Sequence, residues 1–382
     1  MWIYIFLFVI VVLMAYQEIS YKRFTNRTFA FIMVGLAIFV GLADMLGGYD
    51  RYIYAELFDE IADMTKLGQL GSYTDSALFN LYVSEWGYGW VNVIISFVTK
   101  NRYIFIFILT AIIYYNLFKV LKKYTTSYAV ALMFFMAFWF FFTFTYLRQV
   151  LAVTFVWYGI KYILERKFIR FLIVVILASS FHNSAIIFML MYFIPNIKYD
   201  KGDILWLVVF VFIAGLSGLP SALYDMYSAV TETERDSGLD EDSTARWAYL
   251  IESAFILFIV FKNYDNLFRN RIMTLMTNMA IVFSLILVLF YKSDNGGRLS
   301  WLFMIGVIST LTSIYQNQSN RRLVRISLEL MCTALYLRIV LAWGVQLYPY
   351  KTFLTPGVRD GDFIEQMYEY DHNYDEDKLY RL

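Results

Sequence analysis

Apolar runs long enough to cross a lipid bilayer fill most of this chain, and they restrict the fold to a bundle of membrane helices. Within residues 138–193 the apolar sequence is interrupted by Arg148, Gln149 and His182. A charge at membrane depth is costly unless it faces protein, water or a ligand. These residues therefore predict a membrane protein with a polar site between its helices.

The composition supports this class and argues against several others. Hydrophobic residues make up 60% of the 382 residues and charged residues only 16%, whereas soluble domains carry roughly 25% charged residues. A net charge of +1 gives no general attraction to nucleic acid, so we expect no nucleic-acid partner. With one cysteine and two histidines, we expect no disulfide within the chain, no zinc site and no cofactor.

The apolar runs predict an all-α, polytopic integral membrane protein. A spanning helix needs about 20 apolar residues, and by that criterion we expect about twelve transmembrane helices. They would form a single transmembrane domain at 1–350, followed by a polar C-terminal tail at 351–382. The candidate spans are 2–17, 29–47, 103–120, 127–146, 148–164, 168–181, 183–196, 204–220, 246–262, 272–291, 299–316 and 326–348.

Basic residues occur in every second connection between these spans and indicate how the chain crosses the membrane. Examples are Lys119 and Lys122 after the third span, and Arg166 and Lys167 after the fifth. Since basic loops stay in the cytoplasm, we expect the alternate connections and both termini on the outside.

Two long external loops follow from this topology, at 44–102 and at 221–245, and the second is strongly acidic. A span at 88–101 would invert every basic loop downstream. We therefore expect an interfacial or re-entrant helix in that region, and a short true span is the alternative.

The unusual polar residues gather on the external face of this topology, where they suit an anionic lipid head group. Guanidinium groups bind phosphate through paired hydrogen bonds, and a histidine or a carboxylate can accept the proton of a sugar hydroxyl. Anchoring of loops, snorkelling and capping of a helix turn are the structural alternatives. The candidate binding residues are Arg148, Gln149, Arg298, Arg51, Arg102, Tyr88 and Arg338, and the candidate catalytic residues are His182, Asp50 and Glu85.

Three segments resemble the EpsG branch of the Wzy-type polysaccharide polymerases. They are GGYDRYIYAELFD, then EWGYGWVNVIISFVTKNRY, and then LRQVLAVTFVWYGIKYILERKF followed by SSFHNSAIIFM. The resemblance covers residues 1–200 well and 270–350 loosely. The residues that match the family pattern are Asp50, Tyr54, Phe58, Glu85, Gly87, Tyr88, Asn92, Arg148, Gln149, Arg166, Lys167, Phe181, His182, Ser184 and Ala185.

This resemblance implies a metal-independent glycosyltransferase of GT-C-like architecture that polymerises a surface polysaccharide such as O-antigen, capsule or exopolysaccharide. It would lie in the bacterial cytoplasmic membrane with its active site facing outward. Its donor and acceptor would be undecaprenyl-diphosphate-linked oligosaccharides held in membrane lipid, and a chain-length regulator protein is a candidate partner. Arginines would stabilise the diphosphate leaving group, and a histidine or carboxylate would activate the acceptor hydroxyl.

Three other functions remain as alternatives. An O-antigen-type ligase would transfer the glycan to a different lipid acceptor. A flippase or exporter of the lipid-linked glycan would need charges along a path across the whole membrane, whereas the cytoplasmic half of the spans is nearly devoid of charge. A structural or sensor membrane protein is the third alternative.

Overall fold

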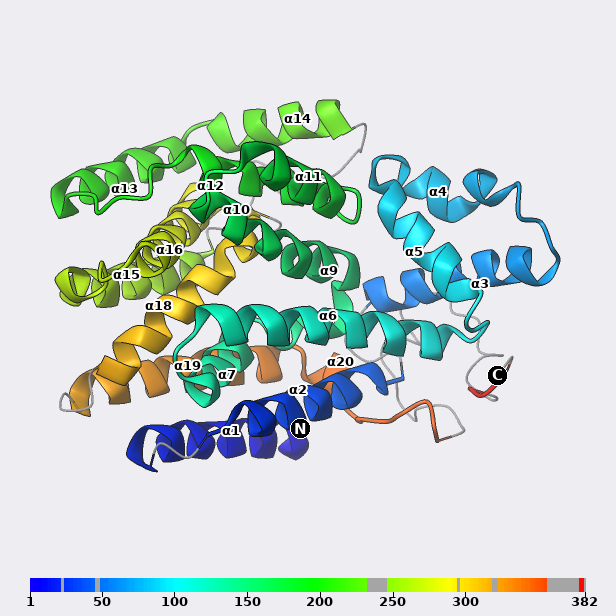
Figure 1. The fold of residues 1–382 in the computed structure, drawn as a ribbon, viewed down its shortest axis with the longest axis horizontal. Helices are drawn as coiled ribbons and strands as arrows, with labels where there is room; N and C mark the ends of the chain where they lie inside the picture. The colour runs from blue at the N-terminus through cyan, green and yellow to red at the C-terminus, as the bar shows by residue number, and fades with distance from the viewer. Residues whose placement is uncertain are drawn as a thin grey trace.

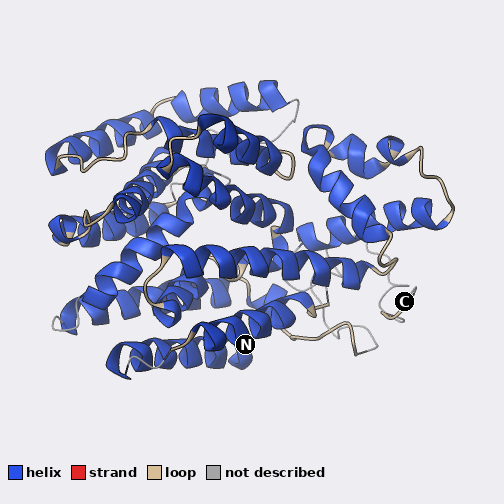
Figure 2. Cartoon of the chain, viewed as in Figure 1, coloured by secondary structure: helices blue, strands red, loops and turns tan. Residues whose placement is uncertain are grey.

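The computed structural model describes residues 1–21, 24–44, 49–231, 246–293, 296–317, 322–355 and 378–380. Nearly all of this part of the chain is helical (Figure 2), and an isolated bridge joins Ala43 and Thr352. The all-α class predicted from the sequence is confirmed for the described residues. Most of the predicted acidic loop, at 232–245, and most of the predicted C-terminal tail, at 356–377, lie outside them.

Each apolar range expected from the sequence contains helix, and further helices occur between these ranges. The α-helices are α1 (Trp2–Tyr21), α2 (Asn26–Gly41), α3 (Tyr49–Lys66), α4 (Ala77–Leu81), α5 (Trp86–Ser96), α6 (Arg102–Tyr124), α7 (Tyr128–Phe138), α8 (Phe142–Thr145), α9 (Leu147–Val156), α10 (Ile160–Leu164), α11 (Phe168–Ser179), α12 (Leu190–Phe193), α13 (Lys201–Leu216), α14 (Leu219–Thr231), α15 (Trp247–Lys262), α16 (Arg271–Leu289), α17 (Gly296–Leu299), α18 (Met304–Asn317), α19 (Arg322–Ala342) and α20 (Gly344–Leu347). The 3₁₀ helices are η1 (Tyr73–Asp75), η2 (Val83–Glu85), η3 (Trp157–Gly159), η4 (Asn183–Met189), η5 (Tyr264–Asn266) and η6 (Ser300–Phe303).

Four helical segments in the described part of the chain are long and apolar enough to cross a membrane. They are α1, α6, α16 and the continuous run from α17 to α18. The apolar helices α2, α7 and α11 and the segment Asn183–Phe193 are shorter. The length and apolar character of these helices indicate an all-helical membrane protein.

The helix α7 forms the centre of the bundle. Its residues from Ala129 to Phe138 are all buried, and it packs against α1, α18 and α19. In a bilayer the attraction between helices comes from close packing rather than from exclusion of water. The helices α16 and α18 pack closely, and a Cβ atom on Gly306 would lie only 2.4 Å from Met279 Cβ. A glycine therefore permits the approach of these two helices.

Polar side chains cap the helices that position the site. Asn101 begins α6 and accepts hydrogen bonds from the backbone N–H groups of Tyr103 and Ile104. At the opposite end of the bundle, the Glu18 carboxylate on α1 accepts from the N–H groups of Tyr128 and Ala129 at 3.0 and 2.8 Å. Glu18 thereby satisfies orphan donors and complements the dipole at the start of the central helix.

The predicted external loop at 44–102 folds into a helical unit at one end of the molecule. The helices α3, α4 and α5 lie together there, beyond the start of α6 (Figure 1), and α5 packs on α3. The 11 residues of α5 rise only about 16 Å, roughly half of the hydrocarbon core of a bilayer. Apolar side chains of Trp90, Ile94 and Phe97 are exposed on it. These properties suit an interfacial position.

The C-terminal residues 378–380 fasten this helical unit to the bundle. Lys378 is buried and forms an ion pair with Asp44. The Asn101 amide donates to the backbone carbonyls of Lys378 and Tyr380 at 2.9 and 2.8 Å. The Tyr380 hydroxyl donates to Asp59 at 2.9 Å. The C-terminal residues therefore lie at the same end of the molecule as α3, α4 and α5 (Figure 1).

Candidate functional site

Arg148 and Glu85 form a buried ion pair between α9 and the outer helical unit. Arg148 is the second residue of α9, where its charge opposes the helix dipole and requires an anionic partner. The two side chains are 9% and 1% exposed. The second carboxylate oxygen of Glu85 accepts the backbone N–H of Asn183 at 3.0 Å. Three segments far apart in the sequence therefore meet at the Glu85 carboxylate.

Three tyrosine rings surround the Arg148 guanidinium. Its central carbon lies 3.5 Å from the ring centroid of Tyr82, 5.3 Å from that of Tyr54 and 5.7 Å from that of Tyr88. Such cation–π contacts are worth more when they are desolvated, as they are here. Burial raises the pKa of Tyr54 and of Tyr88 against the opposing effect of Arg148. Both phenols therefore stay protonated and can donate hydrogen bonds at neutral pH.

Gly87 allows the start of α5 to approach the end of α11. A Cβ atom at this position would lie 2.1 Å from Ser180 Oγ. The next residue, Tyr88, donates its backbone N–H to the Ser180 carbonyl at 3.0 Å. This close contact fixes Tyr88 and, two residues before Gly87, the Glu85 carboxylate.

His182 begins η4 and acts as its N-terminal cap. Its Nδ1 accepts the backbone N–H of Ser184 at 3.3 Å and lies 2.8 Å from the Ser184 hydroxyl. A ring nitrogen that accepts a hydrogen bond carries no hydrogen, so neutral His182 has its proton on Nε2. The same side chain can therefore cap the helix through Nδ1 and donate a hydrogen bond through Nε2–H. The next residue, Asn183, contacts Glu85, so His182 lies beside the ion pair.

Arg51 and Arg102 hold the outer helical unit on the bundle. Arg51 is fully buried and donates to the carbonyls of Val40, Ala43 and Phe144 at 2.8 to 3.1 Å. Arg102 is also buried and pairs with Asp59 through Nε and Nη2. These contacts support loop anchoring, the structural alternative for both arginines.

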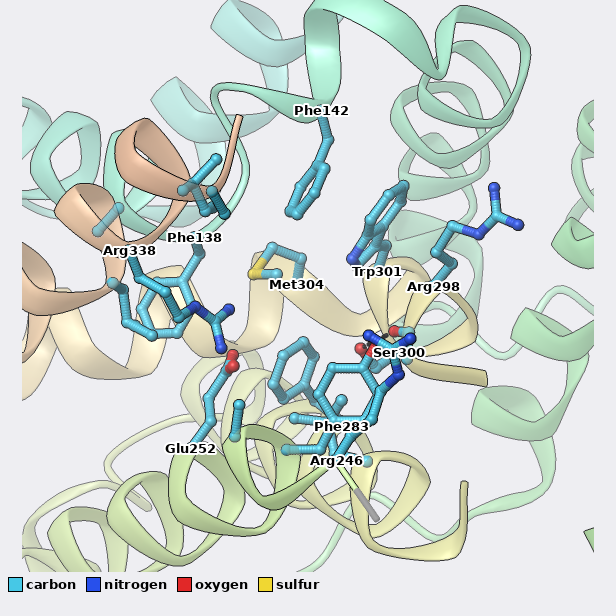
Figure 3. A pocket seen from close by; sticks show the side chains of 18 of the residues that line it. Phe138, Phe142, Arg246, Glu252, Phe283, Arg298, Ser300, Trp301, Met304 and Arg338 are labelled. Carbon is cyan, nitrogen blue, oxygen red and sulfur yellow. Dashed lines mark hydrogen bonds between the residues drawn. The ribbon is translucent and has the colours of Figure 1, made fainter. Parts of the chain in front are cut away.

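A second group of arginines lines a cavity of about 640 Å³ between α15, α16, α18 and α19. Small-molecule sites typically have volumes of roughly 300–1,000 Å³. Arg298 and Arg246 lie on one side of the cavity, and Arg338 and Glu252 face each other on the other side (Figure 3). The rest of the wall is largely aromatic, and it includes Phe138, Phe142, Tyr146, Tyr249, Phe283, Trp301 and Trp343.

The cavity adjoins the Arg148 ion pair through neighbouring residues of the chain. Gln149 donates its side-chain amide to the backbone carbonyl of Arg298 at 3.2 Å. Tyr146, two residues before Arg148, lines the cavity, and its ring centroid lies 4.9 Å from the Arg298 guanidinium carbon. Asp50, in the first turn of α3, lies within electrostatic range of the Tyr54 and Tyr146 hydroxyls. The two groups thus form one continuous polar region.

The structure divides the residues predicted from the sequence into three sets. Arg298 and Arg338 line the cavity, while Arg51 and Arg102 lie in the contacts that hold the outer unit. The residues around the ion pair are Arg148, Gln149, Tyr88, Glu85, His182 and Asp50.

Sequence reasoning did not propose Arg246, Tyr249 or Glu252 as site residues, although all three line the cavity. A carboxylate inside an apolar span is by default a functional-site residue, and this signal was present at Glu252. Tyr249 is one helical turn before Glu252, on the same face of α15.

Comparison with known proteins identifies the family of this chain. It matches no curated protein and no solved structure. The EpsG family model matches residues 26–352, which include the Arg148 ion pair and the whole cavity. The predicted resemblance is confirmed, and the chain belongs to the EpsG family.

Proposed function

We propose that this protein is a polysaccharide polymerase that joins lipid-diphosphate-linked repeat units at the outer face of the bacterial cytoplasmic membrane. The family membership indicates a polysaccharide polymerase. The observation that carries the rest is that Arg246, Arg298 and Arg338 all line one aromatic-walled cavity. We assign the remaining apolar ranges predicted from the sequence to further spans of a GT-C-like bundle of about twelve. In such a bundle consecutive helices, such as α7 with α8 and α9 with α10, would together make up one span of sufficient length.

The chemistry of the cavity suits a diphosphate attached to a sugar and a lipid chain. A diphosphate carries several anionic oxygens, and guanidinium groups bind such oxygens with two donors each. Aromatic faces such as Trp301 and Trp343 offer stacking surfaces for sugar rings. Preorganised cations in a water-poor site also stabilise the charge that develops on a leaving diphosphate. The arginines would then take the role that a metal ion has in other transferases.

We assign Arg148 to the edge of this binding site. Its Nε makes no hydrogen bond within the described residues, although one terminal nitrogen pairs with Glu85. Gln149 supports the cavity through the Arg298 backbone. The ion pair would thus position α9 and α17 around the diphosphate and leave a donor of Arg148 for the substrate.

A reconstituted reaction tests this function directly. The purified protein in lipid nanodiscs would receive a lipid-linked repeat unit as its only substrate. We expect glycans of two or more repeats on a single lipid diphosphate, with one lipid diphosphate released for each bond formed. Arg298→Gln and Arg338→Gln should reduce elongation strongly, whereas Arg170→Gln, at an exposed basic position that does not line the cavity, should not.

A deletion strain distinguishes the alternatives. Surface glycan of one repeat indicates a lost polymerase, and absence of surface glycan indicates a lost flippase or exporter. Long glycan that remains on the lipid diphosphate indicates a lost ligase. Either of the last two results would contradict the polymerase assignment.

A further inference from the structure

Glu252 is the carboxylate that lines the arginine cavity. It lies on α15, in the sixth position of the helix, and Arg338 occupies the fifth position from the end of α19. At 1.5 Å per residue, both lie roughly 6–8 Å inside the ends of their helices. Their side chains point toward each other on one side of the cavity (Figure 3), and neither makes a hydrogen bond with another described residue. A carboxylate at membrane depth without such bonds is costly and indicates a function.

Two other candidates for proton transfer are engaged in holding the fold. The oxygens of Glu85 accept from Arg148 and from the Asn183 N–H. The Nδ1 of His182 accepts the Ser184 N–H, and its Nε2 then carries the hydrogen. Each would have to break a buried contact before it could accept a proton. Asp50 lies beside Tyr54 and Tyr146 and does not line the cavity.

We propose that Glu252 is the general base of the transfer reaction and that Arg338 positions its carboxylate. This inference rests on the function proposed above. One Glu252 oxygen takes the proton of the acceptor sugar hydroxyl, and the hydroxyl oxygen forms a bond to the anomeric carbon of the donor. The bond from that carbon to the diphosphate oxygen breaks, and its electron pair leaves with the lipid diphosphate. The cavity arginines stabilise the charge that this step places on the diphosphate.

The first test compares Glu252→Gln with wild-type protein in the nanodisc assay. Glutamine keeps the shape of the side chain and removes its ability to accept a proton. We expect kcat to fall by about 10²–10⁴-fold, with the donor KM changed less than about threefold because the arginines remain. Glu329→Gln is the matched control, since Glu329 is likewise a carboxylate within an apolar helix, α19, but is bonded to the Tyr315 hydroxyl and does not line the cavity. It should retain wild-type turnover.

The second test is chemical rescue. In Glu252→Ala, added formate can occupy the space of the missing carboxylate and accept the proton. We expect a formate-dependent rise in turnover of at least tenfold, which a merely structural role would not produce. Glu252→Asp should keep partial activity. If Glu252→Gln is unstable, the melting temperature of Glu252→Asp shows whether a variant at this position still folds.

Three outcomes separate this inference from the proposed function. If the wild-type protein elongates no lipid-linked glycan, the proposed function fails irrespective of Glu252. If the wild type elongates and Glu252→Gln keeps more than a tenth of the wild-type kcat, Glu252 is not the base. An inactive Asp50→Asn variant would then assign that role to Asp50. If Glu252→Gln raises the donor KM at unchanged kcat, Glu252 only positions Arg338 and the inference is overturned.

Discussion

The Arg148 guanidinium contacts a carboxylate and the faces of tyrosine rings at the same time, and a lysine cannot reproduce this set. An ammonium group is a compact point charge, whereas the guanidinium is planar, stacks on rings and retains further donors. The closest of these rings is Tyr82, whose centroid lies 3.5 Å from the guanidinium carbon. We therefore expect Arg148→Lys to lose most polymerisation even if the charge pair with Glu85 survives.

Gel analysis of surface glycan at matched protein level measures this effect. Arg170→Lys is the control, because Arg170 is exposed. Wild-type chain lengths in Arg148→Lys would remove Arg148 from the binding site and leave it a role in folding only.

His182 combines a cap with a potential donor, and two substitutions separate these roles. Asparagine is among the best N-cap residues, so His182→Asn should keep the cap on the Ser184 N–H, whereas His182→Ala should lose it at a cost of about 1 kcal/mol. Both variants lack the Nε2–H. If that group donates to the substrate, each should lose turnover by about 10²-fold.

Thermal unfolding and nanodisc turnover would be measured for both variants. We expect His182→Asn to be as stable as wild type and nevertheless slow. Full turnover in His182→Asn combined with low stability in His182→Ala would restrict His182 to its capping role.

At the scale of elements, the C-terminal residues 378–380 act as a fastener for the α3–α5 unit. Deletion of residues 378–382 would leave the buried groups of Asp44, Asp59 and Asn101 without their C-terminal partners. Each buried polar group that loses its partner costs about 1–3 kcal/mol. We expect a lower melting temperature and faster proteolysis within residues 66–82, the part of the unit in which exposed residues are most frequent.

Tyr380→Phe provides a milder version of this test, since it removes the bond from the hydroxyl to Asp59 and keeps the aromatic ring. The melting temperature and the rate of proteolysis of Tyr380→Phe should lie between those of the wild type and of the deletion variant. Thr355→Ala, at an exposed residue, is the control. An unchanged proteolysis pattern in the deletion variant would show that the outer unit is held by Arg51 and Arg102 without the C-terminal residues.

Helix positions could be predicted from the sequence because an apolar run with charged residues at its ends indicates where a membrane helix begins and ends. The subdivision of the predicted spans 127–146 and 148–164 could not be predicted, because turns at Trp139–Phe141 and at η3 occur inside apolar sequence. Such turns are stabilised by buried bonds, as where Thr143 donates to the Phe140 carbonyl at 2.7 Å. The hydrophobicity pattern does not distinguish such a turn from a continuous helix.

At the scale of the whole molecule, charge distribution predicts on which side of the membrane the site lies, but it does not predict which charges meet there. Arg298 and Arg338 can be predicted from the sequence because one lies at the edge of an apolar run and the other within one. Arg51 was grouped with them, yet it bonds to three backbone carbonyls. The distinction depends on tertiary contacts between segments far apart in the chain, and a single sequence does not contain them.

The orientation of the molecule decides whether this site can act on exported glycan. The α3–α5 unit and the C-terminal residues lie at one end of the bundle (Figure 1), while Lys119, Lys122 and Lys123 lie at the far end of α6. Positive residues remain in the cytoplasm, so the α3–α5 unit should be external. Ser72 is exposed in this unit and is a suitable labelling position.

Cysteine labelling in whole cells tests this orientation. In a Cys332→Ser background, Ser72→Cys should react with an impermeant thiol reagent in intact cells, or in spheroplasts if an outer membrane intervenes. Lys122→Cys, exposed at the other end, should react only after the cytoplasmic membrane is opened. Cys332 is buried, so its replacement removes background without altering the surface. The reverse labelling pattern would place the arginine cavity near the cytoplasmic face. A polymerase of exported repeat units could not use a site there, so that result would contradict the topology and the proposed function together.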